Sequence, residues 1–197
     1  MPRTRRSSAP ADPTDLASHL RRETAAAHDR LEQSLSLLSQ PLDRQRFLRV
    51  LERFHGFHAV WECAIRQRSK FAAFHAPRAR LPHLRRDLAA LGRTTAEIRA
   101  LPVCRAAEGL AGDEAATLGS LYVMEGSTLG GQVIGRALAG TGWAPCGGIT
   151  YFDPYGRRTG EMWRGFQGFL AAQDPDRDRA AAGARETFAL LEDWLAA

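Results

Sequence analysis

A long apolar segment interrupted by glycines is the feature that most restricts the fold of this chain. Residues 112–140 (GDEAATLGSLYVMEGSTLGGQVIGRALAG) place apolar side chains three and four positions apart, which predicts one long helix. The middle of that helix nevertheless contains Gly126, Gly130, Gly131 and Gly135. An interior glycine costs a helix about 1 kcal/mol relative to alanine, so the four together cost about 3–4 kcal/mol. A helix that keeps them must gain something from a face without side chains.

The spacing of these glycines limits what the gain can be. Gly126 and Gly130 lie four residues apart, as do Gly131 and Gly135, so each pair lies along one side of the helix. A flat ligand could approach the bare backbone closely, and close packing against another helix explains the spacing equally well. A membrane-spanning dimer helix is excluded, because polar side chains interrupt the apolar run: Glu125, Gln132 and Arg136.

Length and composition favour a single all-α domain. The 197 residues suffice for one domain with a sizeable core, and no stretch alternates β-branched residues as a strand does. The three cysteines are far apart and odd in number, which favours a reduced cytoplasmic protein over a disulfide framework. The net charge of +5 comes from arginines scattered among acids. That pattern indicates solvated helix surfaces, so no nucleic-acid partner is expected.

The remaining segments predict further helices around the glycine-rich one. Residues 1–13 are rich in arginine, serine and proline, and predict a disordered basic arm ahead of a domain at 14–197. Apolar spacing and capping residues predict helices over these ranges: 14–38, 43–70, 84–91, 95–100, 103–109, 159–172 and 176–196. Residues 141–157 predict an irregular loop, and their length indicates a packed or functional segment.

One histidine of the first predicted helix is a candidate ligand. His28 lies on the inward, apolar stripe beside three alanines, with Thr24 and Glu32 one turn away on either side. Either neighbour could accept a hydrogen bond from the ring nitrogen that does not ligate a metal. A histidine on an apolar face is also often a simple core residue, so both interpretations remain open.

The histidines of the second predicted helix do not suggest a metal centre. Glu52 and His55 form one Glu-x-x-His pair, whereas a di-iron bundle requires a second copy, and no other glutamate precedes a histidine by three residues. We therefore interpret Glu52, His55 and His58 as surface or interhelical groups.

The first helix and the glycine-rich helix together resemble the haem oxygenase superfamily, in particular the bacterial enzymes that accompany bacteriophytochromes. The first contributes Leu20, Thr24, His28 and Glu32 at intervals of four, and the second contributes YVMEGSTLGGQ at 122–132. The resemblance extends over about 14–196 and includes YFDPYG at 151–156 and TFALL at 187–191. Each motif alone is weak, but their order and spacing are specific.

The resemblance implies a single helical domain in which haem is sandwiched between the first helix and a kinked glycine-rich helix. It makes His28 the proximal iron ligand and Glu32 the group that orients it. The glycines border the haem on its oxygen-binding, or distal, side: Gly126, Gly130 and Gly131. Side chains near the open haem edge would bind the propionates: Arg21, Tyr122 and, as a weaker candidate, Arg164.

Ser127 departs from the best-known pattern of the family. Many members have an aspartate immediately after the first distal glycine, where it organises the water that delivers protons. A serine hydroxyl can donate and accept hydrogen bonds but carries no charge. Ser127 is therefore either a catalytic group, together with Gly126 and Gly130, or a residue of the helix surface.

The implied reaction is oxidative cleavage of haem to biliverdin with release of CO and Fe²⁺. Haem would be both substrate and cofactor, O₂ the oxidant, and a ferredoxin- or flavodoxin-type protein the external electron donor. The biliverdin would supply a bacteriophytochrome, or the released iron would be used; no membrane partner is expected. Two alternatives remain: a haem carrier of the same fold without turnover, and a thiaminase-like bundle, which would need a positioned cysteine nucleophile.

Overall fold

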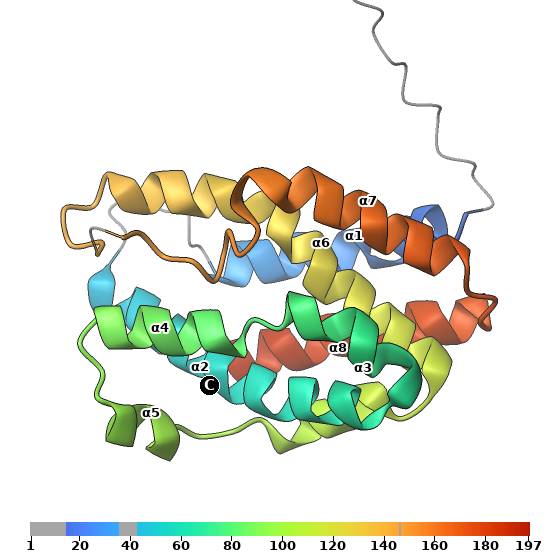
Figure 1. The fold of residues 1–197 in the computed structure, drawn as a ribbon, viewed down its shortest axis with the longest axis horizontal. Coiled ribbons are helices and arrows are strands. Elements are labelled where there is room, and N and C mark those ends of the chain that lie inside the picture. Colours follow the sequence, from blue (N-terminus) through green and yellow to red (C-terminus); the bar gives the residue numbers. More distant parts are fainter. Residues whose placement is uncertain (1–14, 36–42, 146) are drawn as a thin grey trace, which may run out of the picture.

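The glycine-rich segment forms one continuous helix, α6 (Glu114–Ala139), in the computed structural model of the chain. Asp113 caps its first turn, because its carboxylate accepts a hydrogen bond from the backbone N–H of Ala116. Figure 1 shows that α6 bends about half way along its length, as the expected kink requires. The structure describes residues 15–35, 43–145 and 147–197, so the predicted basic arm lies outside the described residues.

The other described elements are also helical, which confirms the all-α prediction. They are α1 (Leu16–Leu35), α2 (Arg44–Gln67), α3 (Ser69–His75), η1 (Ala76–Arg78), α4 (Leu81–Ala90), α5 (Thr95–Ala100), η2 (Arg105–Ala111), η3 (Gly156–Arg158), α7 (Thr159–Ala171) and α8 (Arg177–Ala196). None of the helices in the described ranges is long and apolar enough to cross a membrane.

Several predicted boundaries differ from the structure, and the two largest differences have local reasons. The second helix ends at Gln67 rather than near residue 70, because Arg68 adopts an extended backbone and the separate helix α3 follows it. Helix α4 begins at Leu81, three residues before the predicted start. Pro82 is tolerated there, since the first turn of a helix does not use its N–H groups. Residues 36–38, the predicted end of the first helix, lie outside the described residues.

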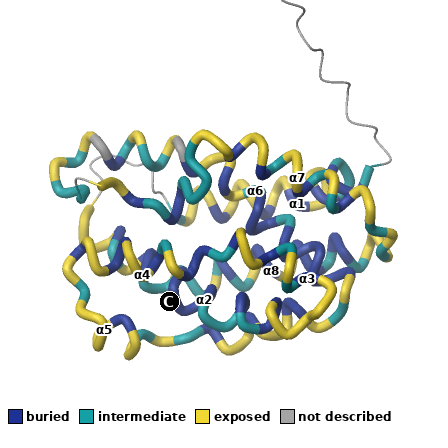
Figure 2. The backbone as a smooth tube through the Cα atoms, in the orientation of Figure 1, coloured by how far each residue is buried: buried dark blue, intermediate teal, exposed yellow. Residues whose placement is uncertain are grey.

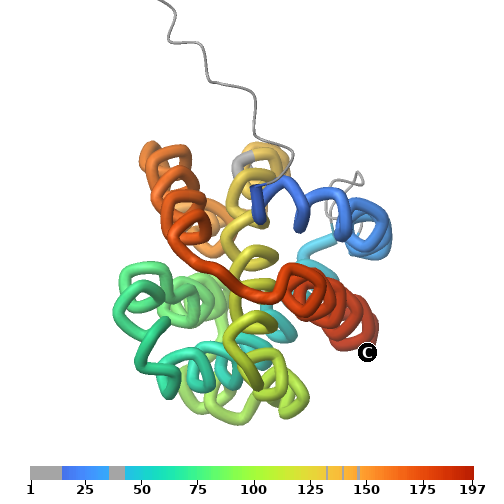
Figure 3. The backbone as a smooth tube through the Cα atoms, turned by 90° about the vertical axis from the view of Figure 1, so that its right-hand side faces the viewer, coloured from blue at the N-terminus to red at the C-terminus, as the bar shows by residue number. Residues whose placement is uncertain are grey.

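Close packing between helices uses glycines outside the 126–135 cluster. A Cβ on Gly119 of α6 would lie 2.1 Å from the carbonyl oxygen of Ala180 in α8. A Cβ on Gly183 of α8 would lie 2.5 Å from the Cα of Ala116 in α6. Helix α6 is therefore the central column of the bundle, with α1 and α8 on one side and α3 and α4 on the other (Figure 3).

The predicted irregular loop is packed against the bundle. Ile149, Tyr151 and Phe152 are buried, and the Asp87 carboxylate of α4 accepts hydrogen bonds from the backbone N–H groups of Thr150 and Tyr151 at 2.8 and 2.7 Å. Across the described part of the chain, buried residues lie mainly in the middle of the molecule, and exposed residues predominate on outer elements such as α5 (Figure 2). The loop therefore has a fixed position beside the second half of α6.

Candidate functional site

One side of α6 presents bare backbone and apolar side chains to open space. A Cβ on Gly130 would meet no atom within 4 Å, and one on Gly126 would meet only the ring of Trp163, at 4.0 Å. Leu129 and Val133 are 49% and 44% exposed, and they are the exposed large hydrophobic side chains of the described chain. We call Gly126, Leu129, Gly130 and Val133 the open face of α6. Such a strip fits a flat apolar ligand better than solvent.

Gly131 does not belong to this face. A Cβ there would lie 1.6 Å from the carbonyl oxygen of Phe152 in the packed loop. Gly131 is about 140° around the helix from Gly126, so it faces protein while Gly126 faces open space. The close approach that Gly131 permits is therefore that of a loop backbone, and its contact with haem stays a prediction.

Helix α1 borders the open face with residues predicted to hold the haem edge. Tyr122 precedes Gly126 by one turn, and its phenol lies close to the Thr24 hydroxyl of α1. Burial raises the pKa of Tyr122, although the charge of Arg21 and the neighbouring Thr24 hydroxyl act in the opposite direction. The structure thus brings Arg21 of α1 and Tyr122 of α6 together.

His28 lies at the rim of the buried stripe of α1, so the predicted inward position is wrong. Its side chain is 51% exposed, and its ring meets the Phe188 ring edge-on with 6.0 Å between centroids. The cause is helical geometry, because His28 is about 40° around the helix from buried Thr24. Nε2 lies 3.6 Å from Glu32 and Nδ1 3.7 Å from Asp29. Asp29 is thus a second candidate for orienting the ring, and it escapes a pattern of residues spaced four apart because it is adjacent to His28 in the sequence.

Helix α7 carries two further residues to consider near the open face, Trp163 and Arg164. Trp163 of α7 covers the Gly126 end of the open face, with its ring 6.1 Å from that of Tyr122. It is a site residue that sequence reasoning missed, because a tryptophan on an amphipathic helix resembles ordinary core. Arg164 is exposed on α7 next to Gly160 of the same helix. No contact described for the chain joins Arg164 to Arg21 or Tyr122, so its propionate role stays a prediction.

Ser127 lies at the edge of the open face, where its hydroxyl meets a buried arginine. Nη1 of Arg80 donates to the Ser127 hydroxyl at 2.9 Å, and the other amino group of Arg80 donates to the carbonyl of Met124. The Ser127 hydroxyl itself donates to that same carbonyl at 2.8 Å. Ser127 is exposed whereas Arg80 is only 3% exposed, so the serine lies on the border between the open face and the core.

The histidines of α2 are buried, so of the two predicted interpretations, surface or interhelical groups, the surface one does not hold for them. His58 is fully buried, and its ring nitrogens lie 2.9 Å from the Glu62 carboxylate and 3.1 Å from the Tyr151 hydroxyl. Burial acts to raise the pKa of Glu62, but hydrogen bonds from His58 and the backbone of Arg80 bring it to about 2. His55 is 5% exposed, and burial lowers its pKa to about 4. The missed signal was the spacing of His58 and Glu62, one helical turn apart.

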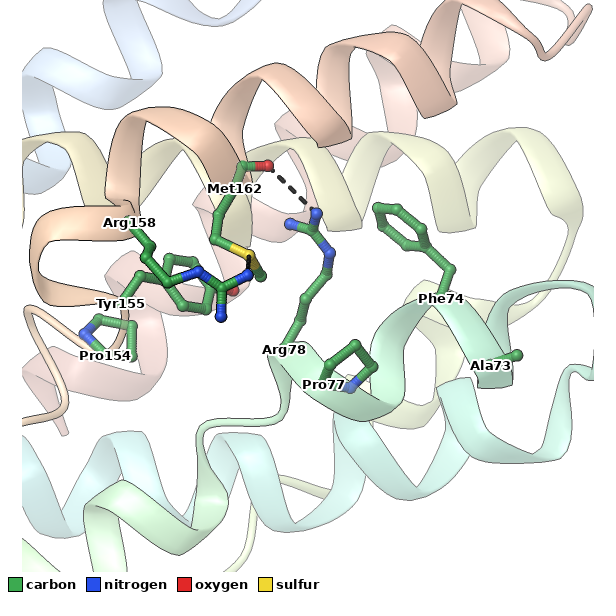
Figure 4. A pocket seen from close by; sticks show the side chains of 8 residues that line it. All are labelled: Ala73, Phe74, Pro77, Arg78, Pro154, Tyr155, Arg158 and Met162. Carbon is green, nitrogen blue, oxygen red and sulfur yellow. Dashed lines mark hydrogen bonds between the residues drawn. The ribbon is translucent and has the colours of Figure 1, made fainter.

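A separate cleft of about 480 Å³ lies between η1 and the start of α7 (Figure 4). It is lined by Ala73, Phe74, Pro77, Arg78, Pro154, Tyr155, Arg158 and Met162. The Arg78 guanidinium lies 2.5 Å from the buried carboxylate of Glu125 and donates to the Met162 carbonyl at 3.1 Å. Arg158 is paired with Glu161 at 3.0 Å. Both cations of the cleft thus bind protein groups, and Arg78 fastens η1 to α6.

Comparisons with known proteins identify the family of this chain. The Heme oxygenase family model matches residues 14–197. A heme oxygenase of Xanthomonas campestris pv. campestris (strain 8004) is 39% identical over 128 residues, which cover 61% of this chain and 69% of that protein.

Solved structures show the same fold at lower sequence identity. The heme oxygenase of Leptospira interrogans matches with a TM-score of 0.80 and 19% identity over 93% of this chain and 99% of its own. Heme oxygenase-1 of Synechocystis sp. PCC6803, solved in complex with heme, matches with a TM-score of 0.72 and 15% identity over 92% and 91% of the two chains. With the family model spanning nearly its whole length, this chain belongs to the haem oxygenase family.

Proposed function

We propose that this haem oxygenase binds haem between α1 and the open face of α6 and cleaves it to biliverdin, CO and Fe²⁺. The observation that carries the proposal is the open face itself. A Cβ on Gly130 would meet no atom within 4 Å, and one on Gly126 would meet only the edge of the Trp163 ring. Leu129 and Val133 are exposed one turn apart on the same side, which makes an apolar patch that a ligand could cover. A haem plane would cover both features at once.

The donors available beside this face suit haem. His28 projects from the rim of α1, so one ring nitrogen can reach iron while Glu32 or Asp29 accepts a hydrogen bond from the other. Arg21 and Tyr122 offer a cation and a hydroxyl to propionates at one edge. When bound, haem supplies both the iron that activates O₂ and the carbon framework that is cleaved.

The two glycines would act by leaving space where a side chain would otherwise lie. Without side chains at Gly126 and Gly130, a ligand plane can approach the backbone of α6, and O₂ can enter between them. A larger residue at either position would occupy that space. Leu129 and Val133 would exclude bulk water from the same side, which limits competing reactions.

The external partners follow from charge and chemistry. The net charge of +5 supports docking of an acidic electron donor of the ferredoxin or flavodoxin type. We further propose that the biliverdin serves as a bacteriophytochrome chromophore, and that the protein acts in the cytoplasm, where its free cysteines would stay reduced.

A reconstitution assay tests the proposal. Haem is added to the purified protein, followed by ascorbate or a ferredoxin reducing system, and the Soret band is recorded with time. We expect it to be replaced by the bands of biliverdin, with the product identified by chromatography. A Soret band that persists under reducing, aerated conditions would instead identify a haem carrier, and absence of any Soret complex would contradict both functions.

A further inference from the structure

A buried cation lies directly behind the open face of α6. Arg80 is the residue that precedes α4, and it is 3% exposed. Its guanidinium donates to the Ser127 hydroxyl and to the Met124 carbonyl, both on α6 and 47 and 44 residues away in the sequence. It therefore ties α4 to the part of α6 from which Gly126 and Gly130 face open space.

Among the described residues, the guanidinium of Arg80 bonds to neutral groups, whereas the buried carboxylate beside it, Glu62, bonds to its backbone. The neighbouring buried arginine, Arg78, has its guanidinium 2.5 Å from the Glu125 carboxylate. Arg80 forms no ion pair of this kind with any described residue; the Glu62 carboxylate accepts hydrogen bonds from its backbone N–H, at 2.8 Å, and from that of Leu81, at 2.9 Å. The Glu62 carboxylate offsets part of the cost of burying this charge, while the guanidinium itself is directed at neutral groups of α6.

The backbone of Arg80 is held in place from α2. The Glu62 carboxylate that accepts the two backbone N–H groups also lies 2.9 Å from His58, and His58 reaches the Tyr151 hydroxyl at 3.1 Å. The Arg80 guanidinium in turn lies 5.9 Å from the centre of the Tyr151 ring. This arrangement restricts the positions that the guanidinium can take.

The geometry also decides what Ser127 can offer to a ligand. Its proton goes to the Met124 carbonyl at 2.8 Å, and one of its two lone pairs accepts from Arg80 at 2.9 Å. One lone pair remains. Ser127 can therefore hold a water molecule by accepting its hydrogen, but it cannot donate while both bonds are made.

We infer that Arg80 is a positioning residue that fixes Ser127 as a hydrogen-bond acceptor and gives the open face of α6 a positive field. The inference rests on the proposed function, since it concerns the face at which haem would bind. The family resemblance leads one to expect a carboxylate at position 127. In this chain that position holds a serine bonded to the cation of Arg80. Haem ligands that carry negative charge are therefore favoured on this face.

Anion and neutral ligand binding to the ferric haem complex tests the inference. Arg80→Met removes the charge while roughly keeping the length of the side chain. We expect the Kd of azide, an anion, to rise about five- to tenfold, the effect of one partly screened charge. The Kd of imidazole, measured at a pH where it is neutral, should change less than twofold. A purely structural role for Arg80 would weaken both ligands alike.

Two further variants distinguish the effect of losing the Arg80 charge from the effect of damaging the fold. Arg86→Met removes an exposed arginine from α4, the helix that follows Arg80, and should leave both dissociation constants unchanged. Ser127→Asp places a carboxylate against Arg80 at an exposed position, so it cancels the charge without emptying the core. It should weaken azide to a similar degree, and it keeps the inference testable if Arg80→Met does not fold.

The outcomes distinguish this inference from the function on which it rests. Haem cleavage by the unsubstituted protein decides the function, and the ratio of azide to imidazole affinity decides the role of Arg80. Equal loss of both ligands, no loss of azide binding in Ser127→Asp, or the same loss in Arg86→Met would overturn the inference even if turnover is normal. Failure of the unsubstituted protein to bind haem would overturn both.

Discussion

Neighbouring glycines of α6 should respond to alanine with opposite signs. Gly130→Ala adds a methyl group where no atom lies within 4 Å, whereas Gly131→Ala places one 1.6 Å from the Phe152 carbonyl oxygen. Both substitutions gain about 1 kcal/mol of helix propensity. The comparison therefore isolates the surroundings of each Cβ from the intrinsic preference of the helix.

The structure gives a magnitude for each variant. Gly130→Ala should stabilise the haem-free protein by up to about 1 kcal/mol, which raises the Tm of a chain of this size by about 2–4 °C. For Gly131→Ala the overpacking cost lies near the upper end of its usual range, about 3 kcal/mol, because the obstacle is backbone rather than a flexible side chain. After the gain in propensity, about 2 kcal/mol of destabilisation remains, so the Tm should fall by about 4–8 °C.

Thermal unfolding followed by circular dichroism checks both values, and haem binding checks the role of the open face. Haem should raise the Tm of the unsubstituted protein by mass action. Gly130→Leu should lose most of that rise, because its side chain occupies the proposed haem space, although it improves helix propensity. A lower Tm for haem-free Gly130→Ala, or an unchanged Tm for Gly131→Ala, would refute the assignment of these two glycines to opposite surroundings. Normal haem binding and turnover in Gly130→Leu would refute the open face as the haem site.

Three further predictions concern the ligand, the buried histidines and the electron donor. His28→Ala should lose the histidine-type ferrous haem spectrum and recover part of its activity with free imidazole, whereas His19→Ala, on the same helix, should behave normally; normal spectra in His28→Ala would eliminate the assignment. Burial lowers the pKa of His55 and His75 from 6.5 to about 4, so the unfolded chain binds more protons in that window and stability should fall as the pH falls from 6.5 to 4. His75→Phe should reduce the slope of stability against pH by up to about 1.4 kcal/mol per pH unit, and an unchanged slope from chemical denaturation would contradict this. Glu62, with its pKa lowered from 4.5 to about 2, should add a further loss below pH 4.5. Donor-dependent turnover should decrease as salt is raised while ascorbate-driven turnover changes much less, and an equal response would contradict electrostatic docking.

Local features were predictable from the sequence because the interactions that create them span about four residues. Apolar spacing predicted α6, and Asp113 caps its first turn. Thr94 and Glu97 form a capping box at the start of α5, within four residues of one another. The order of motifs around His28 and Gly126 led to the correct family, because each motif lies within one helix.

The surroundings of each helix were decided only by the tertiary structure. Nothing in the spacing of the glycines shows that Phe152, more than twenty residues later, covers Gly131 and leaves Gly130 open. The contact between Arg80 and Ser127 joins residues 47 positions apart. Helical periodicity shows which residues lie on the same side of a helix. Which segment covers that side depends on how distant parts of the chain pack together. This packing decides which glycines lie against a loop and which are left open to a ligand.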